Sequence, residues 1–322
     1  MSIGIFDPSI GTGNIGDEII MDSVRKVMDE ITPYEFKIFF PTQEKISKIS
    51  HKKIKIMDFT VVGGTNLLSS NMNKHNQWKI NFIDSIYISN AVLFGVGWWQ
   101  YQDKPNIYTE LLYKRILSNT YIHSVRDSFT EQQLKSIGIE NVLNTACPTT
   151  WSLTKEHCAK ISQEKAKDCI FTLTDYMKSI SEDKALIDIL VRNYDKVYFW
   201  VQGSRDIEYF KSLDIDEASI IIVPPSLKDY DRLLTYTDSL DFIGTRLHAG
   251  IRALQKGVRS IIVAVDNRAI EKSKDINLKI ILRNKIHNDL EEMLNSSFET
   301  NILLPEENIT LWKKQFSDYQ SI

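Results

Sequence analysis

The sequence predicts an α/β protein with two doubly wound, Rossmann-like domains that face each other across a cleft. Short apolar runs alternate with amphipathic stretches along most of the chain, which is the pattern of parallel strands joined by helices. A chain of 322 residues is also too long for one ordinary hydrophobic core. A polar, weakly periodic stretch at 149–167 interrupts the alternation, so we expect one domain at 1–155 and a second at 156–322.

The first domain is expected to start with a strand and continue as strand–helix units. Ile20, Val24 and Val27 recur at helical spacing, and buried-looking apolar runs end at glycines. The basic segment His51–Lys55 leads into an apolar strand and is interpreted as its solvated entrance. The expected strands are Ser2–Phe6, Thr60–Val62, Ala91–Phe94 and Tyr121–Val125, and the expected helices are Glu18–Glu30, Asn106–Leu117 and Phe129–Ser136.

The second domain repeats the alternation and ends in a helical tail. The tail, Asn288–Tyr319, suggests two helices with Trp312 and Phe316 on one apolar face, where packing is the favoured role. The expected strands are Cys169–Leu173, Lys196–Val201, Ile220–Val223, Leu240–Ile243 and Ser260–Val265, and the expected helices between them are Glu182–Arg192, Asp229–Thr237 and Leu247–Gln255. Because open α/β sheets bind ligands at the carboxyl ends of their strands, the loops after these strands are the candidates for function.

Composition excludes several classes of protein. A net charge of −3 gives no electrostatic reason to expect nucleic acid. Cys147, Cys158 and Cys169 form no CxxC pair, which favours a reducing compartment over a disulfide framework or zinc site. We see no signal peptide, no apolar run of bilayer length and no cluster of metal ligands, so we expect a cytoplasmic protein without metal or membrane span. Contact of the protein with a lipid-linked substrate at the inner face of the membrane remains an alternative.

The first motif runs from Gly11 to Glu18, between the first strand and the first helix, and fits the dinucleotide fingerprint GxGxxG. Asp17 and Glu18, however, occupy the first helical turn, where they would repel a pyrophosphate. Three interpretations remain: a glycine loop with acidic helix capping, a loop that contacts a sugar acceptor, or a NAD-type site.

Two further strand ends carry candidate residues. Gly63 and Gly64 either admit a ligand close to the backbone or make a tight turn. Arg126 presents a guanidinium that suits carboxylate or phosphate, whereas a structural pair with Asp127, capping the next helix, is the alternative. Trp98, after a third strand, lies beside Trp99 and Tyr101; such rings pack on sugars and are equally suited to a half-buried interface.

The most specific segment is Gly244–Gly250. A strand ends at Gly244, and Arg246 and His248 stand at the start of the next helix. An anion there would meet free backbone N–H groups, the positive end of the helix dipole, a guanidinium and an imidazole. The segment therefore predicts an anion site, against the alternative of a histidine satisfied within the core.

The segments GTGNIGDE, VVGGTNLLS, SVRDSFT and GTRLHAGIRAL occur in this order in the polysaccharide pyruvyltransferase family, which the chain resembles from about Ile3 to Val265. The Arg-Leu-His segment is the specific one. The resemblance implies a fold similar to the two-domain glycosyltransferase B architecture. It also implies phosphoenolpyruvate as co-substrate, no other cofactor, and a bacterial surface sugar or its precursor as acceptor, which receives pyruvate as a cyclic ketal.

The resemblance and the chemistry of ketal formation together give each candidate residue a role. His248 would protonate the enol carbon and Asp17 would accept the hydroxyl proton. Donor binding falls to the second domain and to one residue of the first, namely Arg246, Thr245, Leu247 and Arg126. Acceptor binding falls to the N-terminal loops, namely Gly13, Asn14, Gly16, Gly64, Asn66 and Trp98. A lipid-linked or nucleotide-linked acceptor and a homo-oligomer both remain open.

Three other functions remain as alternatives. A nucleotide-sugar glycosyltransferase of the same architecture usually offers an acidic ribose-binding segment, which the helix after His248 lacks at its start. A NAD-dependent enzyme would use the first glycine loop. A sugar-binding protein would keep the fold without turnover.

Overall fold

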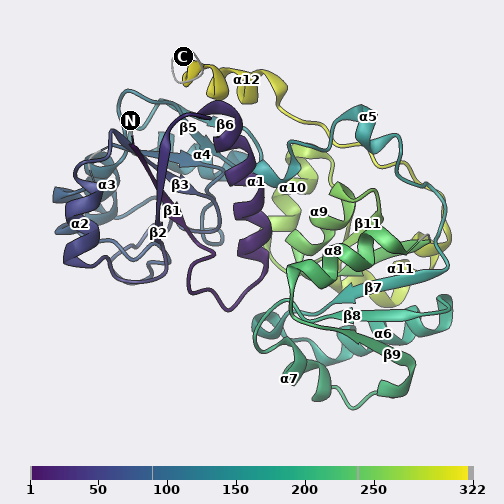
Figure 1. Ribbon diagram of the computed structural model, residues 1–322. Helices are drawn as coiled ribbons and strands as arrows, with labels where there is room; N and C mark the ends of the chain where they lie inside the picture. The colour runs from purple at the N-terminus through teal and green to yellow at the C-terminus, as the bar shows by residue number, and fades with distance from the viewer. Residues whose placement is uncertain (1, 89, 238, 318–322) are drawn as a thin grey trace. The chain divides into compact units, whose positions relative to one another are not determined.

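The computed structural model describes residues 2–88, 90–237 and 239–317 (Figure 1). Its contacts divide the chain into two compact units, which we describe one at a time. Unit 1 contains the residues up to Thr12, Ile20–Trp151 and the segment from Leu304 on, and unit 2 contains Gly13–Ile19 and Ser152–Leu303.

Unit 1 is built on a parallel sheet with the strand order β2-β1-β3-β4. A second parallel pair, β5 with β6, continues from a bridge between Val96 and Val125. Strands β3 and β4 are buried along their whole length, as expected for parallel strands covered on both faces. The strands are β1 (Ser2–Asp7), β2 (Phe36–Pro41), β3 (Phe59–Gly63), β4 (Ala91–Phe94), β5 (His123–Val125) and β6 (Val142–Asn144).

The helices of unit 1 begin at side-chain caps wherever the sequence offers one. Asn106 caps α3 and Asp127 caps α4, each by accepting a backbone N–H of the first turn. Helix α1 starts in the residues grouped with unit 2 and continues in unit 1. The helices are α1 (Gly16–Ile31), α2 (Lys48–Ile54), α3 (Ile107–Ile116), α4 (Ser128–Lys135) and α12 (Glu306–Lys314), with short 3-10 helices η1 (Asp84–Ile86) and η2 (Pro148–Thr150).

Unit 2 holds a parallel sheet with the order β12-β11-β10-β7-β8-β9. The chain runs outward from β7 to β9 and then returns beside β7 to run outward again from β10. This reversal between β7 and β10 is the topological switch point at which doubly wound sheets bind ligands. The strands are β7 (Asp168–Thr172), β8 (Val197–Trp200), β9 (Ile220–Val223), β10 (Leu240–Gly244), β11 (Arg259–Ala264) and β12 (Ile280–Leu282).

Helices cover both faces of the unit 2 sheet. Apolar residues of α6, α7 and α11 form one core with alternate residues of the strands, whereas α8 and α9 pack on the opposite face (Figure 1). The helices are α5 (Lys155–Cys158), α6 (Ile180–Asn193), α7 (Asp206–Lys211), α8 (Leu227–Tyr236), α9 (Leu247–Gln255), α10 (Asn267–Ile276) and α11 (Ile286–Asn295), with η3 (Asp175–Met177), η4 (Glu217–Ser219) and η5 (Arg283–Lys285).

The C-terminal segment differs from the expectation that 156–322 would form one domain. From Leu304 on it groups with unit 1, because Trp312 and Phe316 are fully buried against the β3 and β4 core. The Trp312 ring stacks on Phe94 at 4.2 Å between centroids, and Phe316 stacks on Phe59 at 5.7 Å. The predicted tail contains α11 and α12, and its last predicted residue, Tyr319, lies outside the described residues.

One local prediction is wrong. Most of the segment His51–Lys55 lies in helix α2, rather than forming a strand entrance, and Ser47 caps that helix. Within the part of the chain that the structure describes, none of the helices combines the length and the hydropathy needed to cross a bilayer.

Candidate functional site

The switch point of unit 2 is lined by threonine side chains from two neighbouring strand ends. The hydroxyl of Thr174 lies 2.8 Å from that of Thr245, and the hydroxyl of Thr172 accepts the backbone N–H of Arg246 at 3.1 Å. A Cβ on Gly244 would overlap with the Thr172 side chain, so this close approach requires glycine. These contacts fix the backbone just after β10, at the point where Arg246 begins.

Arg246 lies in this frame and is held by carboxylates. Its Nε donates to the carbonyl of Leu173 and to Asp206, both at 3.0 Å. Its Nη2 donates to the second oxygen of Asp206 and, at 3.1 Å, to Asp175. Burial raises the pKa of the Asp206 carboxyl, and the neighbouring guanidinium opposes that rise. A buried guanidinium with two carboxylate partners is largely neutralised, so the predicted contact between Arg246 and an anionic donor stays a prediction.

Residues that the sequence analysis missed surround this ion pair. The exposed Tyr176 ring contacts two guanidiniums, with its centroid 5.2 Å from that of Arg246 and 5.8 Å from that of Arg268. Arg268 is paired with Asp266 and donates to the Tyr176 hydroxyl, while Arg205 pairs with Asp175 at 3.0 Å. The sequence could have indicated these residues. Tyr176 follows β7, Arg205 follows β8 and Arg268 follows β11, just as Arg246 follows β10.

His248 and Leu247 occupy the first turn of α9, directly after Arg246 at the helix N-cap. Both side chains are 5% exposed. Ala249 follows them, and its carbonyl accepts the buried Tyr230 hydroxyl at 2.8 Å, which ties this turn to α8. His248 is therefore set in a rigid helix start rather than on a free loop.

The loop Gly13–Gly16 belongs to unit 2, although it was predicted to serve an acceptor site of the first domain. The side-chain carbonyl of Asn14 accepts the amide of Gln202 at 2.7 Å and the backbone N–H of Gly16 at 3.1 Å. The carbonyl of Gly13 accepts Ser204 N–H at 2.9 Å, so the loop is attached to the end of β8.

Asp17 follows this loop in the first turn of α1 and is 4% exposed. It is grouped with unit 2, which also contains His248. The two residues predicted to handle protons therefore lie in the same compact unit, although the sequence analysis assigned them to different domains.

Arg126 stands at the end of β5 in unit 1 and is 2% exposed. Its Nη2 donates to the Asn66 side chain, and its Nε donates to Asp127 at 3.3 Å. Among the residues that the structure describes, none accepts a hydrogen bond from its Nη1. A Cβ on Gly97 would overlap with the guanidinium, so glycine is required there. The arrangement brings Arg126 and Asn66 together. It also leaves the buried guanidinium with a donor, Nη1, that has no acceptor among the described residues.

Gly64 and Trp98 lie near this arginine but are explained by packing. A Cβ on Gly64 would overlap with the carbonyl of Gly95, so the ends of β3 and β4 can lie this close only when residue 64 is glycine. Trp98 is 1% exposed, and its indole N–H is shared between Ser70 at 3.2 Å and Gln102 at 3.1 Å. These contacts favour the packing alternative for both residues.

The neighbouring aromatic residues are more accessible than Trp98. Trp99 is half-buried and stacks on His75 with ring centroids 3.6 Å apart. Burial, helped by the positive charge of Lys79, lowers the pKa of His75, which favours its neutral ring. Tyr101 is 52% exposed and packs edge-on against Phe129. Unit 1 thus presents the aromatic faces of Trp99 and Tyr101 just after β4, at two of the three aromatic positions named in the sequence analysis.

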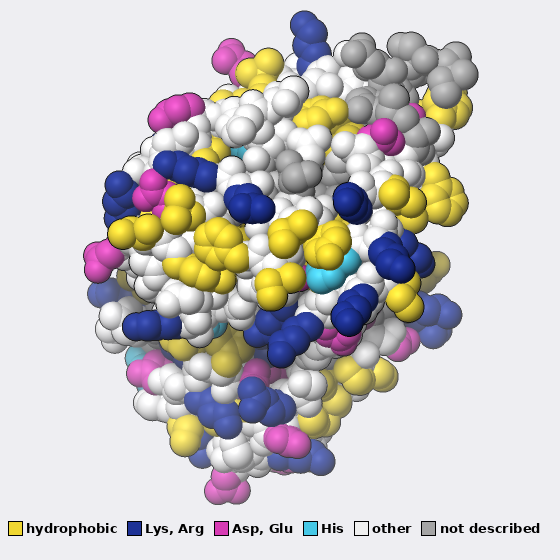
Figure 2. Space-filling model, turned by 90° about the vertical axis from the view of Figure 1, so that its left-hand side faces the viewer, with side chains coloured by type: hydrophobic (Ala, Val, Ile, Leu, Met, Phe, Trp, Pro, Cys, Tyr) yellow, Lys and Arg dark blue, Asp and Glu magenta, His cyan; other side chains and the backbone are white. Residues whose placement is uncertain are grey.

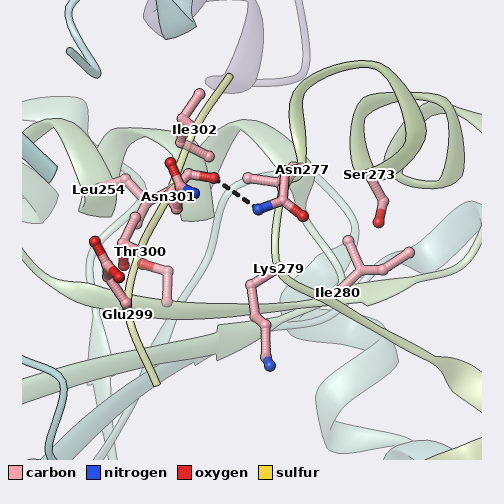
Figure 3. A pocket seen from close by; sticks show the side chains of 11 residues that line it. Leu254, Ser273, Asn277, Lys279, Ile280, Glu299, Thr300, Asn301 and Ile302 are labelled. Carbon is pink, nitrogen blue, oxygen red and sulfur yellow. Dashed lines mark hydrogen bonds between the residues drawn. The ribbon is translucent and has the colours of Figure 1, made fainter. Parts of the chain in front are cut away.

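A cavity of about 250 Å³ lies elsewhere in unit 2, between α10, β12 and the segment 299–302 (Figure 3). The side-chain amide of Asn277 donates to the carbonyl of Asn301 at 2.9 Å across it, and Lys279 and Glu299 also line it. Among its described lining residues there is no predicted site residue, and we assign it no part in the chemistry.

Comparison with known proteins supplies the fold and the family. The UDP-GlcNAc 2-epimerase of Methanocaldococcus jannaschii, in complex with UDP-GlcNAc and UDP, is similar with a TM-score of 0.58 and 12% identity over 99% of both chains. MnaA of S. aureus, in a co-structure with UDP, has a TM-score of 0.56 and 11% identity over 93% of this chain and 91% of its own. These likenesses confirm the predicted two-domain, Rossmann-like fold of glycosyltransferase B type.

Sequence comparison is more specific. No protein of curated function matches the chain. The sequence model of the family described as polysaccharide pyruvyl transferase matches residues 14–267, which include the predicted acid His248, the predicted base Asp17 and both arginines predicted to bind the donor.

Proposed function

This chain belongs to the polysaccharide pyruvyl transferase family, and we propose that it joins pyruvate from phosphoenolpyruvate to a surface sugar as a cyclic ketal. Family membership makes it a transferase of polysaccharide biosynthesis. The donor, the ketal product and the residue roles below are our proposal.

The main support for this proposal is the burial and hydrogen bonding of Arg126. Its guanidinium is buried and fixed by Asn66 and Asp127, and within the described residues Nη1 lacks an acceptor. A buried donor without a partner is costly, which makes an arriving oxyanion a favourable ligand. Phosphoenolpyruvate offers a carboxylate and a phosphate, and both match the planar fork of an arginine.

Proton transfer falls to His248 and Asp17. Imidazolium at His248 would donate its proton to the methylene carbon of phosphoenolpyruvate, which places positive charge on the adjacent carbon, C2. A sugar hydroxyl then attacks C2 and gives its proton to the Asp17 carboxylate. General acid catalysis of this kind contributes about two to four orders of magnitude in rate.

The second half of the reaction closes the ring. The bond between C2 and the phosphate oxygen breaks, and inorganic phosphate leaves with the bonding electrons. A second hydroxyl of the same sugar attacks C2 and gives its proton to the now neutral imidazole of His248, which completes the ketal and restores the acid, while the departing phosphate takes the proton held by Asp17. Arg126 would stabilise the charge that develops on the anion. Thr245, Leu247 and Arg246 would set the position of His248 through the strand end that they share.

Acceptor recognition is proposed for the aromatic surface after β4. The stacked pair of Trp99 and His75, together with the exposed Tyr101, offers faces on which a sugar ring can pack. Of the three aromatic residues named after this strand in the sequence analysis, the assignment keeps Trp99 and Tyr101 and leaves out Trp98, whose ring is enclosed.

The test is an assay of donor and acceptor together. The protein is incubated with phosphoenolpyruvate and free, lipid-linked or nucleotide-linked sugars, and released phosphate and product mass are measured. We expect phosphate release that depends on a sugar and a product heavier by pyruvate minus water. Sugar transfer from a nucleotide sugar, without any product from phosphoenolpyruvate, would instead identify a glycosyltransferase.

A further inference from the structure

Three elements of unit 1 form one continuous surface. The His51 side chain of α2 lies 2.7 Å from the carboxylate of Asp84 in η1, and its ring stacks on Tyr87 at 4.3 Å. Phe82, just before η1, packs edge-on against Tyr108 of α3 at 4.9 Å. We call the outer side of α2, η1 and α3 the α2–α3 surface.

Large aliphatic side chains project from this surface without contributing to the core. Ile49 on α2 is 70% exposed, and Ile107 on α3 is 78% exposed. Figure 2, which views the molecule from the side of α2 and α3 in Figure 1, shows hydrophobic side chains gathered across the middle of this side. The exposed aliphatic residues of its segments are Ile49, Ile56, Ile83, Ile86, Ile107 and Leu111.

The burial pattern of α3 shows that its exposed aliphatic residues do not contribute to the hydrophobic core. In α3 the positions Leu112, Tyr113 and Ile116 are buried and face the core, while Ile107 and Leu111 are one turn apart on the opposite side. An exposed apolar row beside a complete buried face is typical of an interaction surface.

The same surface is positively charged although the whole chain is negative. Its segments, 45–56, 82–87 and 103–115, contain eight Lys and Arg residues and three acidic ones, whereas the chain has a net charge of −3. Of the acids, Asp84 is buried against His51 and Glu110 is paired with Lys114 at 2.7 Å. The basic residues are Lys45, Lys48, Lys52, Lys53, Lys55, Lys104, Lys114 and Arg115.

We propose that the α2–α3 surface docks onto an anionic lipid bilayer. The aliphatic side chains would enter the boundary between headgroups and acyl chains, while the flexible lysines reach lipid phosphates. Protein partners fit less well, because protein interfaces are depleted in Lys and enriched in aromatic residues, whereas α2 is rich in Lys and its exposed apolar residue is Ile49. The proposal does not depend on the chemistry proposed above.

The experiment is sedimentation of the full chain with lipid vesicles. Vesicles of phosphatidylcholine alone are compared with vesicles that also contain phosphatidylglycerol. We expect binding to the anionic vesicles, weak binding to the neutral ones, and release as added salt shortens the screening length.

Two pairs of substitutions locate the surface. Ile107→Gln with Leu111→Gln should lower the partition coefficient about tenfold, and so should Lys52→Glu with Lys53→Glu. Ile221→Gln and Lys211→Glu change exposed residues of unit 2 in the same way and should leave binding unchanged. Thermal melting of each variant checks that the fold is intact.

Three outcomes would overturn the proposal. In the first, the wild-type chain fails to sediment with anionic vesicles. In the second, folded variants of the α2–α3 surface bind as well as the wild type. In the third, the wild type stays off the vesicles but forms dimers that the Ile107→Gln and Leu111→Gln pair dissociates. That result would assign the surface to a second copy of the chain.

Discussion

Arg126 and Arg246 have the same predicted role but different surroundings. Arg246 is held by Asp206 and Asp175, two carboxylates that largely cancel its charge. Arg126 has one carboxylate partner, Asp127, and an amide partner, Asn66, and keeps a buried nitrogen without an acceptor among the described residues. Of the two guanidiniums, we therefore expect Arg126 to contribute more to anion binding and Arg246 more to the stability of its loop.

We predict that Arg126→Lys weakens phosphoenolpyruvate binding about 10- to 100-fold, because an ammonium cannot reproduce the planar fork. Isothermal titration gives the dissociation constant directly. Arg192→Lys, at an exposed position of α6, is the matched control and should bind like the wild type. Equal affinity of Arg126→Lys and wild type would remove Arg126 from the donor site.

His123 gives the protein a defined dependence of stability on pH. Its Nδ1 accepts the backbone N–H of Leu93 at 3.2 Å and its Nε2 lies 2.9 Å from the carbonyl of Ser118, which fits a neutral ring that donates from Nε2. Burial lowers the pKa of His123 from 6.5 to about 4. The unfolded chain therefore takes up a proton below pH 6.5 that the folded chain does not bind until near pH 4.

From this difference we predict that the free energy of unfolding falls by about 3 kcal/mol as pH drops from 6.5 to 4 on account of His123. In His123→Gln, whose amide can make both hydrogen bonds, this part of the fall should disappear. Urea unfolding at several pH values measures both chains. Parallel curves for the two chains would show that His123 is not the responsible group.

At the scale of elements, buried strands could be predicted and lightly buried elements could not. The strands β3, β4, β7 and β10 are apolar at most of their positions, because both of their faces are covered. Helix α2 buries one residue, Ile54, so it has no apolar stripe to reveal its period. Strand β2 lies at the edge of its sheet with Phe36 69% exposed, and its pattern is equally weak.

Strand ends in unit 1 depend on backbone contact, which leads to a prediction for Gly64. A methyl group there would overlap with the carbonyl of Gly95, so Gly64→Ala should lower the free energy of unfolding by about 3 kcal/mol. Gly257→Ala is the control: its φ of +79° is strained for alanine but its surroundings are open, so about 1 kcal/mol is expected. Chemical denaturation measures both, and equal losses would contradict the packing explanation.

At the scale of the whole molecule, the sequence predicted two α/β units but not which chain segments build each. Residues 13–19 group with unit 2 and the segment from Leu304 groups with unit 1, because their contacts are with residues far away in the sequence. For the same reason, the partners of Arg246 could not be predicted from the sequence. Asp175 and Asp206 come from two other strand ends, and strand order cannot be read from one sequence. The candidate strand ends themselves could be found, since each follows an apolar run.

The C-terminal segment should accordingly be part of the stability of unit 1. We predict that Trp312→Ala lowers the free energy of unfolding by about 3–5 kcal/mol, because its fully buried ring packs on Phe94. Leu311→Ala, at a neighbouring residue that is 49% exposed, should change it by less than about 0.5 kcal/mol. Loss of stability in both variants alike would show that the segment does not close this core.

In the proposed reaction, His248 protonates the methylene carbon of phosphoenolpyruvate before the pyruvyl group is joined to the sugar. Mass spectrometry of the sugar product formed from phosphoenolpyruvate in heavy water measures whether this protonation occurs. We expect a ketal whose methyl group carries one deuterium from the solvent, and His248→Ala should form this product at a rate lower by about two orders of magnitude or more. A product without deuterium, or an unchanged rate in His248→Ala, would contradict it.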